Sequence, residues 1–533
     1  MSAVSFRQSE LPGTSPLFRD LLCDFAAVSG FFAHPPSVAA ACEAASEVRL
    51  ASRRRRRLVD ELSRQNESGD HATRASLDRL ADPSTVVVAT GQQVGLLGGP
   101  AFTLYKALTA VRCAEDLTRR GYPAVPVFWL ATEDHDLAEV DHAWTFDHSS
   151  QPHRLRAVTE GANAAAVGSI RVADARLDEF ESLCSGLPYA AEAVGLARGA
   201  YGGSFRFGRS FQALYESLLA GSGIIFLSPM RQGIRALAAP LVRTVIGRAS
   251  ELADLLLRRG AGLEAAGYHQ QVRFQPSTSL LMLFENARRV ALKRRNGSYW
   301  LGTRSFTPQD LLSRVESAPY DLSPNALLRP VMQDYLLPTA ALVVGPSEAA
   351  YLAQSAALYG NLLGRMPVVM PRASFTVLDP ASRKLLRKHG LSPSDCWVPR
   401  RALDAAIASS LVPAPLRATL RRHSARIGES LRGIEAAVAE FDPTLAASFK
   451  RSQSKIEHQL GKARSKVRLE ALRRSETARR QAARLAGFLY PDGHVQERLY
   501  SVLAFVAKFG PAFVDRVRAA TESGCPDHKV LEI

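Results

Sequence analysis

Residues 85–131 hold two apolar runs that flank a glycine-rich loop and a helical pattern, and this unit most constrains the fold. TVVVAT at 85–90 is short, apolar and rich in β-branched residues, and VPVFWLA at 125–131 has a similar apolar character. Between them, the loop ATGQQVGLLGG is followed at 100–120 by apolar residues with helical spacing. The pattern predicts a strand, a glycine loop, a helix and a second strand.

A helical crossover of this length makes the two strands parallel, and parallel sheets are covered on both faces. The sequence therefore predicts the α/β fold class. Four further apolar runs predict additional strands, several of which lead into helical patterns: 224–227, 279–284, 341–344 and 367–370. Asn296-Gly297, flanked by alternating residues within 290–302, predicts a β-hairpin inserted on the sheet domain.

After about residue 378 the sequence changes to long helical patterns. Two series of apolar residues with heptad-like spacing predict an antiparallel coiled-coil hairpin, and they are Ile427, Leu431, Ile434, Val438 and Phe441, then Phe449, Ile456, Leu460, Ala463 and Val467. Asp442 and Pro443 between the series predict a helix break, with the aspartate as N-cap of the second helix. We therefore expect a sheet domain at 1–380, a basic helical coiled-coil domain at 381–488 and a helical segment returning to the sheet domain at 489–533.

Most of the formal net charge of +16 lies in the helical segment. Residues 381–484 hold 23 Lys and Arg against 9 Asp and Glu, a surplus of 14. Such charge runs are usually solvated helix faces, and this arm has almost none of the aromatic side chains on which nucleic-acid bases stack. We therefore expect a homodimer through the arm, and we do not expect nucleic-acid binding.

Other global features narrow the class of protein. No apolar run approaches the roughly 18 residues of a membrane span, and the N-terminus lacks a signal-peptide pattern. The sequence thus predicts a cytoplasmic protein that does not bind membranes. The six cysteines include no C-x-x-C pair, so neither a disulfide framework nor a zinc site is indicated.

Charged residues gather directly after the second strand, in the stretch Thr132-Glu133-Asp134-His135-Asp136. An ordinary loop seldom concentrates four ionisable side chains in this way, so the stretch predicts an active site. His135 is a candidate general acid or base with a carboxylate orienting it, and Glu133 or Asp136 is a candidate Mg²⁺ ligand. The alternative interpretation is a solvated acidic helix start, which the helix dipole favours.

The glycine loop matches no known phosphate-binding motif, but its place after a strand of the predicted sheet indicates ligand binding. It lacks the lysine and the serine or threonine of a P-loop. Its glycines allow close backbone approach, and Gln92 and Gln93 carry amides that can donate and accept. Because ligands bind beyond the carboxyl ends of parallel strands, this loop and the acidic stretch should form two walls of one pocket. Lys106 ranks lower because it lies about two turns into the predicted helix.

Six long motifs resemble the BshC family, the cysteine-adding enzymes of bacillithiol biosynthesis. They are ATGQQVGLLGGPAFTLYKALTA, PAVPVFWLATEDHDLAEVDH, GYHQQV, LSPNALLRPVMQDYLLPT, LVVGPSEAAYLAQ and MPVVMPRASFTVLD. The resemblance extends over essentially the whole chain. It implies a Rossmann-like core related to class I nucleotidyltransferases, with connecting-peptide insertions, a coiled-coil arm and a homodimer.

The resemblance also implies a reaction, in which the carboxylate of L-cysteine is joined to the amino group of a glucosaminyl-malate. Amide formation from a free carboxylate is uphill in water, so ATP is the expected source of activation, through an adenylate or an acyl phosphate. Mg²⁺ is a possible companion of the nucleotide. The H-x-G-H signature usual in class I nucleotidyltransferases is absent from the sequence, so no motif supports adenylation.

The predicted site combines these segments. Catalysis is expected from the acidic stretch, namely Glu133, Asp134, His135 and Asp136. Substrate or nucleotide contacts are expected from the glycine loop and from later segments, namely Thr90, Gly91, Gln92, Gln93, Gly98, Gly99, Arg329, Gln333, Asp334 and Arg372. Arginine can pair a carboxylate with two hydrogen bonds, which suits Arg329 and Arg372 to the malate carboxylates, but an ordinary salt bridge is an equal interpretation of both. Glu348 fits a dipole partner at a helix start.

Two other classes of function remain open on the sequence. One is a nucleotidyltransferase or RNA-modifying enzyme that uses the basic arm. The other is a non-catalytic scaffold in which the acidic stretch is only a surface helix start.

Overall fold

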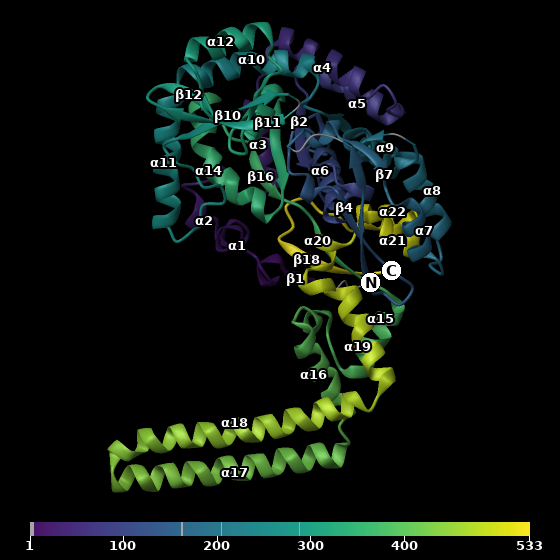
Figure 1. Cartoon of the computed structure of the whole chain (residues 1–533), viewed down its shortest axis with the longest axis vertical. Helices are drawn as coiled ribbons and strands as arrows, with labels where there is room; N and C mark the ends of the chain where they lie inside the picture. The colour runs from purple at the N-terminus through teal and green to yellow at the C-terminus, as the bar shows by residue number, and fades with distance from the viewer. Residues whose placement is uncertain (1–4, 161–163, 204, 287) are drawn as a thin grey trace. The chain divides into compact units, whose positions relative to one another are not determined.

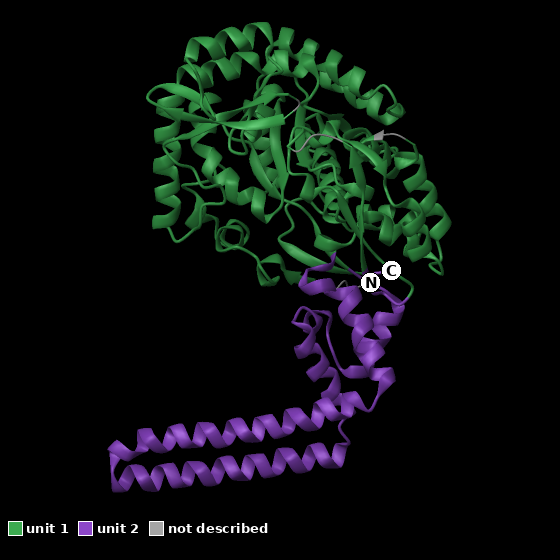
Figure 2. Cartoon of the chain, in the orientation of Figure 1, with its two compact units in different colours: residues 1–148, 153–376, 497–531 green, residues 149–152, 377–496, 532–533 purple. Residues whose placement is uncertain are grey.

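The computed structural model describes residues 5–160, 164–203, 205–286 and 288–533, and the chain divides into two compact units (Figure 2). Unit 1 comprises residues 1–148, 153–376 and 497–531, and unit 2 comprises 149–152, 377–496 and 532–533. Most of the C-terminal segment therefore belongs to unit 1, whereas the predicted coiled coil belongs to unit 2.

Unit 1 is built on a five-stranded parallel sheet of order β16-β15-β2-β3-β9. Its strands are β2 (Val86–Gln92), β3 (Ala124–Leu130), β9 (Ile225–Leu227), β15 (Thr339–Val344) and β16 (Val368–Pro371). Read from β9 and numbered along the chain, the order is 3-2-1-4-5, that of the doubly wound Rossmann fold. The predicted α/β class is confirmed, and the predicted first helix is α6 (Phe102–Arg119), which connects β2 to β3.

Both faces of the parallel sheet are buried. Val86 and Val88 of β2 belong to a hydrophobic cluster that includes residues of α6 and α3 (Val38–Glu47), whereas Val87 and Ala89 belong to a second, larger cluster. Alternate residues of a strand point to opposite faces. The strands are therefore apolar throughout, which explains why they read as continuous apolar runs in the sequence.

A second sheet of unit 1 is antiparallel, with the order β13-β12-β11-β10-β14. Its strands are β10 (Thr278–Glu285), β11 (Arg288–Arg295), β12 (Ser298–Leu301), β13 (Arg304–Phe306) and β14 (Leu322–Pro324). The predicted hairpin at Asn296-Gly297 is confirmed as the turn between β11 and β12. The strand predicted at 279–284 is β10. It pairs antiparallel with β11, which begins three residues after β10 ends, too close for the crossover of a parallel pair.

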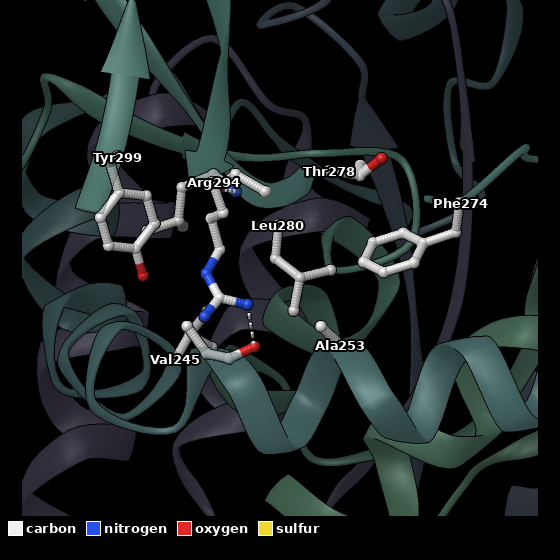
Figure 3. Close-up of a pocket in the computed structure, with 10 residues that line it drawn as sticks. Val245, Ala253, Phe274, Thr278, Leu280, Arg294 and Tyr299 are labelled. Atoms are coloured by element: carbon white, nitrogen blue, oxygen red, sulfur yellow. Dashed lines mark hydrogen bonds between the residues drawn. The ribbon is translucent and has the colours of Figure 1, made fainter. Parts of the chain in front are cut away.

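Arg294 of β11 attaches this second sheet to the helix layer (Figure 3). Its guanidinium donates to the carbonyl oxygen of Ala249 at 2.8 Å and to Ser250 Oγ at 2.7 Å. These residues begin α11 (Ala249–Ala265), directly after α10 (Gln232–Gly247). Figure 3 shows the arginine reaching the helices between Tyr299 and Leu280. The contact fixes the second sheet against the helices that follow β9.

The remaining elements of unit 1 complete its helical layers and small sheets. They are β1 (Ser5–Arg7), α1 (Pro16–Cys23), α2 (Phe25–Val28), α4 (Ser52–Gln65), α5 (His71–Ala81), β4 (His142–Phe146), β6 (Val158–Glu160), β7 (Arg171–Asp174), α7 (Leu177–Cys184), α8 (Ala190–Tyr201), β8 (Phe205–Arg206), α9 (Phe207–Leu218), α12 (Pro308–Ser317), α13 (Arg329–Leu336), α14 (Pro346–Leu362), α21 (Val502–Phe509) and α22 (Ala512–Ala520). The elements that cross from one unit to the other are β5 (Pro152–Arg156), β17 (Ser374–Leu378), α20 (Gln496–Leu499) and β18 (Asp527–Glu532).

Unit 2 contains α15 (Pro380–His389), α16 (Arg400–Leu411), α17 (Ala414–Phe441), α18 (Pro443–Arg473) and α19 (Glu476–Leu489). The two long helices α17 and α18 lie side by side as an antiparallel hairpin (Figure 1). Asp442 caps α18 as predicted, because its carboxylate accepts from the backbone N–H of Thr444 at 2.8 Å and Pro443 follows it. In the described part of the chain, no helix is long and apolar enough to cross a membrane.

Candidate functional site

The carboxyl edge of the parallel sheet gathers most of the predicted site residues. Gln92 ends β2, the stretch Glu133 to His135 follows β3, and Glu348 lies in the first turn of α14, directly after β15. The chain leaves β2 toward β3 on one side, while β15 lies on the other side. This is the switch point at which open α/β sheets bind their ligands.

Lys106 occupies the switch point, although the sequence placed it too far along the helix. Its side chain is fully buried, and Nζ donates to Glu348 Oε2 at 2.6 Å, to Gln92 Oε1 at 3.1 Å and to the carbonyl oxygen of Gly91. Helical side chains point back toward the helix N-terminus, so a lysine more than a turn into α6 reaches the end of β2. Burial lowers the pKa of Lys106, and the neighbouring Glu348 carboxylate opposes that shift.

Two glutamines connect Lys106 to the acidic stretch. Gln92 Nε2 donates to Gln93 Oε1 at 3.1 Å, and Gln93 Nε2 donates to Asp134 Oδ2 at 3.3 Å. The structure thus brings the glycine loop and the acidic stretch together, and one hydrogen of each amide is used within the protein.

Asp134 is held ionised at the end of this connection. Its Oδ1 accepts from the backbone N–H of His135 at 2.7 Å and lies 3.6 Å from the Arg289 guanidinium. Burial by itself raises the pKa of Asp134, but the hydrogen bonds from His135 and Gln93 and the charge of Arg289 lower it well below its ordinary range. A carboxylate stabilised in this way is a weak base.

His135 faces Arg289 of β11. Arg289 Nη1 lies 3.3 Å from His135 Nδ1, whereas Asp134 Oδ1 lies 3.5 Å from the same nitrogen. A guanidinium group only donates, so the Arg289 contact requires Nδ1 to accept, whereas a hydrogen bond to Asp134 requires Nδ1 to carry the ring proton.

Glu133 is a fully buried carboxylate with one free oxygen. Its Oε2 pairs with Arg235 of α10, whose guanidinium also donates to the carbonyl oxygen of Leu322 at 3.1 Å. Glu133 Oε1 is buried and has no hydrogen-bond partner among the residues that the structure describes. Buried polar atoms are nearly always paired, so a free buried acceptor indicates a place for a ligand donor.

Two further arginines interact with the charge of Glu133. Burial lowers the pKa of Arg289, with the charges of Glu133 and Asp134 opposing the shift. Arg329, the first residue of α13, donates to the Tyr351 hydroxyl. Burial lowers the pKa of Arg329, but the tyrosine and the nearby carboxylates of Glu348 and Glu133 raise it above its ordinary value. The sequence identified Arg329 and missed Arg235 and Arg289.

The polar partners of Gln333 and Asp334 lie away from this edge. Gln333 Nε2 donates to Asp334 Oδ1 at 3.3 Å, and the Asp334 carboxylate also accepts from the Tyr359 hydroxyl. Burial raises the pKa of Asp334, while the hydrogen bond from Tyr359 and the neighbouring Thr339 side chain lower it. Thr339 begins β15, so the structure places this buried network toward the amino end of that strand.

Arg372 follows β16, and its guanidinium is paired within the protein. It donates to Glu497 Oε1 at 2.5 Å and to the carbonyl oxygen of Ala373 at 2.9 Å, and both charged side chains are buried. Glu497 is held in turn by Ser374 and by the backbone N–H of Phe375, each at 2.9 Å. Of the two interpretations that the sequence left open, this geometry is that of a salt bridge.

The remaining candidates have structural contacts. Thr90 Oγ1 donates to the carbonyl oxygen of Val343 at 3.0 Å, which joins β2 to β15. Gly98 and Gly99 are buried with positive φ, and the Gly98 carbonyl accepts from the Tyr215 hydroxyl at 2.9 Å. Asp136 is exposed and caps a short helix by accepting from Ala138 N at 3.1 Å. The buried glycines do not present the open backbone cradle that a triphosphate requires.

The carboxylates of the acidic stretch do not combine into a metal site. Glu133 is buried with Arg235 as its counter-ion, while Asp136 is exposed. Across the described ranges, no three His, Cys, Asp or Glu side chains are grouped to hold a metal ion. This donor set does not fit a protein-bound Mg²⁺ ion.

The fold and the site define a Rossmann-like protein with a buried ionic site at the switch point and a separate coiled-coil unit. Residues 2–373 match the family model for the N-terminal Rossmann-like domain of bacillithiol biosynthesis BshC, and residues 375–533 match that for its C-terminal coiled-coil domain. The chain belongs to the BshC family.

Curated relatives agree with this membership. A protein of Solibacter usitatus (strain Ellin6076) is 41% identical over 100% of both chains, and one of Koribacter versatilis (strain Ellin345) is 34% identical over 98% of both. A protein of Salinibacter ruber (strain DSM 13855 / M31) is 33% identical over 97% of this chain and 96% of its own. Each of the three bears the name "Putative cysteine ligase BshC".

Proposed function

We propose that the chain is a ligase that joins the carboxylate of L-cysteine to the amino group of a glucosaminyl-malate. The observation that carries the proposal is Glu133 Oε1, a buried acceptor without a donor in the described structure, on a carboxylate whose charge acts on Arg289 and Arg329. A substrate amine would supply the missing donor, and substrate carboxylates would pair with the arginines. The names of the curated relatives support cysteine as one substrate.

The residues at the sheet edge can perform the protein's part of this reaction. An ammonium group has no lone pair, so it must lose a proton before it attacks the carbonyl carbon of the activated cysteine carboxyl group, from which the phosphate-bearing group leaves. Glu133 Oε1 is placed to hold that group and to accept the proton. Arg329 and the His135 ring would stabilise negative charge on substrate oxygens, and holding both reactants together would supply much of the rate.

ATP is the proposed source of activation, because it gives the cysteine carboxylate a leaving group. We do not place it on the glycine loop, because Gly98 and Gly99 are packed and their backbone is not open. Mg²⁺ in this proposal comes with the nucleotide phosphates, since the protein's own carboxylates, across the described residues, do not form a site for it.

We also propose a homodimer through the coiled-coil arm. Leu431 is the buried residue of α17 and Leu472 that of α18, while Ile434 and Ile456 are 48% and 42% exposed. A two-helix hairpin that leaves its heptad residues this exposed has an apolar seam still to cover. A second copy of the arm presents the same heptad spacing and is the proposed partner.

The ligase proposal is tested with the purified chain, L-cysteine, glucosaminyl-malate and ATP, and the amide product is followed by mass spectrometry. Glu133→Gln removes the charge but keeps the shape, and we expect kcat to fall by about 10²–10⁴-fold. Glu192→Gln, at an exposed position of α8, is the matched control and should keep wild-type activity.

Three outcomes would contradict the proposal. A Glu133→Gln variant with the wild-type rate would remove Glu133 from the reaction. No amide product, together with an unchanged low-molecular-weight thiol pool in a deletion strain, would favour a non-catalytic scaffold. Activity that depends on added RNA would favour the RNA-modifying alternative.

A further inference from the structure

We propose that Lys106 is a positioning residue of the ligase site, because its ammonium group fixes the direction of a hydrogen-bond chain that runs through Gln92 and Gln93 to Asp134. The kinetic consequence rests on the proposed function. The hydrogen-bond chain itself can be measured on the protein without any activity.

The direction follows from the chemistry of the first group. An ammonium group can only donate, so Gln92 must turn Oε1 toward Lys106 Nζ, 3.1 Å away. Its Nε2 then faces Gln93 Oε1 at 3.1 Å, which leaves Gln93 Nε2 to donate to Asp134 Oδ2 at 3.3 Å. Reversing either amide would set two donors or two acceptors against each other.

The Lys106 ammonium group is held in place by its own hydrogen bonds, so it orients the hydrogen-bond chain instead of contacting substrate. Its three N–H groups meet three acceptors, namely the carbonyl oxygen of Gly91, Gln92 Oε1 and Glu348 Oε2. Glu348 Oε2 also accepts from the backbone N–H of Gly345 at 2.9 Å. The ammonium group therefore has no donor left for a phosphate or a carboxylate, and its influence on the site passes through Gln92.

The hydrogen-bond chain ends at Asp134, whose side chain orders the neighbouring residues of the acidic stretch. Asp134 is also faced by the backbone N–H of His135 at 2.7 Å, by Arg289 at 3.6 Å and by the repelling carboxylate of Glu139. Arg289 in turn contacts His135 Nδ1 at 3.3 Å. Without the donor from Gln93, Asp134 would lose one of the groups that hold it ionised and in place, and Arg289 and His135 would lose their common partner.

Four variants test this inference. Lys106→Met removes the charge that sets the direction, and Gln93→Glu reverses the last step by placing a carboxylate against Asp134. Both should lower kcat by at least about tenfold with little change in KM, because orientation is lost and not binding. Lys106→Arg keeps a charged donor and should recover part of kcat. Arg112→Met removes a half-exposed charge from the same helix and should change neither constant.

The second readout is the titration of Asp134, followed by NMR in protein labelled with ¹³C-aspartate. Lys106→Met and Gln93→Glu should both raise the pH at which Asp134 protonates, and Arg112→Met should leave it unchanged. If both variants titrate as the wild type, the hydrogen-bond chain does not act on Asp134 and the inference is overturned. If Lys106→Met does not fold, the titration of Asp134 in Gln93→Glu still tests the hydrogen-bond chain. If the wild type has no ligase activity, the proposed function fails, but the titration still tests the hydrogen-bond chain.

Discussion

Arg372 Nη2 lies 2.5 Å from Glu497 Oε1, and the two buried side chains join the end of β16 to the C-terminal segment of unit 1. Removing one partner of a buried pair leaves an uncompensated charge, so Arg372→Met should lower the free energy of unfolding by about 3–5 kcal/mol. The double variant Arg372→Met/Glu497→Met should recover most of that loss, as measured by urea unfolding. Unchanged stability together with a raised KM for the malate-bearing substrate would instead favour the anion-binding interpretation.

Gly98 is a packing position in the glycine loop. Its φ is +84°, and a Cβ there would lie 3.0 Å from both Leu214 Cδ2 and Val502 Cγ1. Gly98→Ala should therefore destabilise the fold by more than the roughly 1 kcal/mol that a left-handed backbone costs by itself. Gly121→Ala is the matched control, because Gly121 has a φ of +88° and a Cβ there would meet no neighbouring atom within 4 Å among the described residues.

Thermal and urea unfolding of the two glycine variants separate the backbone cost from the packing cost. Equal losses at Gly98 and Gly121 would contradict a packing role for Gly98. A wild-type stability of Gly98→Ala with a raised KM for ATP would return the glycine to the phosphate-cradle interpretation.

His528 gives the fold a defined acid sensitivity. The ring is buried between Ser374 Oγ, 2.7 Å from Nδ1, and Thr376 Oγ1, 2.8 Å from Nε2, and burial lowers the pKa of His528 to about 4. Histidine in an unfolded chain has a pKa of about 6.5. Between these pH values the unfolded chain binds a proton at His528 that the folded chain does not. The contribution of His528 to the free energy of unfolding is therefore fully present above about pH 6.5 and is lost as the pH drops toward 4.

Between pH 7 and pH 5, His528 should lower the free energy of unfolding by about 2 kcal/mol, measured as the difference between urea unfolding curves at the two pH values. His528→Gln cannot take up this proton and should lose correspondingly less stability over the same interval. Equal pH dependence in the wild type and the variant would show that His528 does not titrate as its burial implies.

Short sequence patterns predicted the turns and helix starts whose backbone conformation depends on only a few neighbouring residues. Asn296-Gly297 specified a two-residue turn, and Asp442 with Pro443 specified a helix start, because the backbone conformations they favour are set within a few residues. The apolar run at 279–284 could be read as a strand but not assigned to a sheet. Its partners, β11 and β14, are fixed by pairing and not by its own composition.

The candidate site divides in the same way. Gln93 and Asp134 could be placed together from the sequence, because each follows one of two adjacent parallel strands. Arg235 and Arg289 could not, since they reach the site from α10 and β11, more than 100 residues along the chain from Glu133. Asp334 was misplaced because a carboxylate in a polar motif does not reveal which edge of the sheet it faces.

The exposed heptad residues of the arm make the proposed homodimer directly testable. Ile434→Glu and Ile456→Glu place charges on the apolar seam of α17 and α18, and burying an unpaired carboxylate between two arms is costly. We expect both variants to be monomers in sedimentation velocity at micromolar concentrations where the wild type is a dimer. Helix content by circular dichroism should not change, because the two side chains are already largely exposed within their own hairpin.

Ala447→Glu adds the same charge at an exposed position of α18 outside the heptad series, and it should remain dimeric. A monomeric wild type, or dimers of both isoleucine variants, would contradict assembly through the arm.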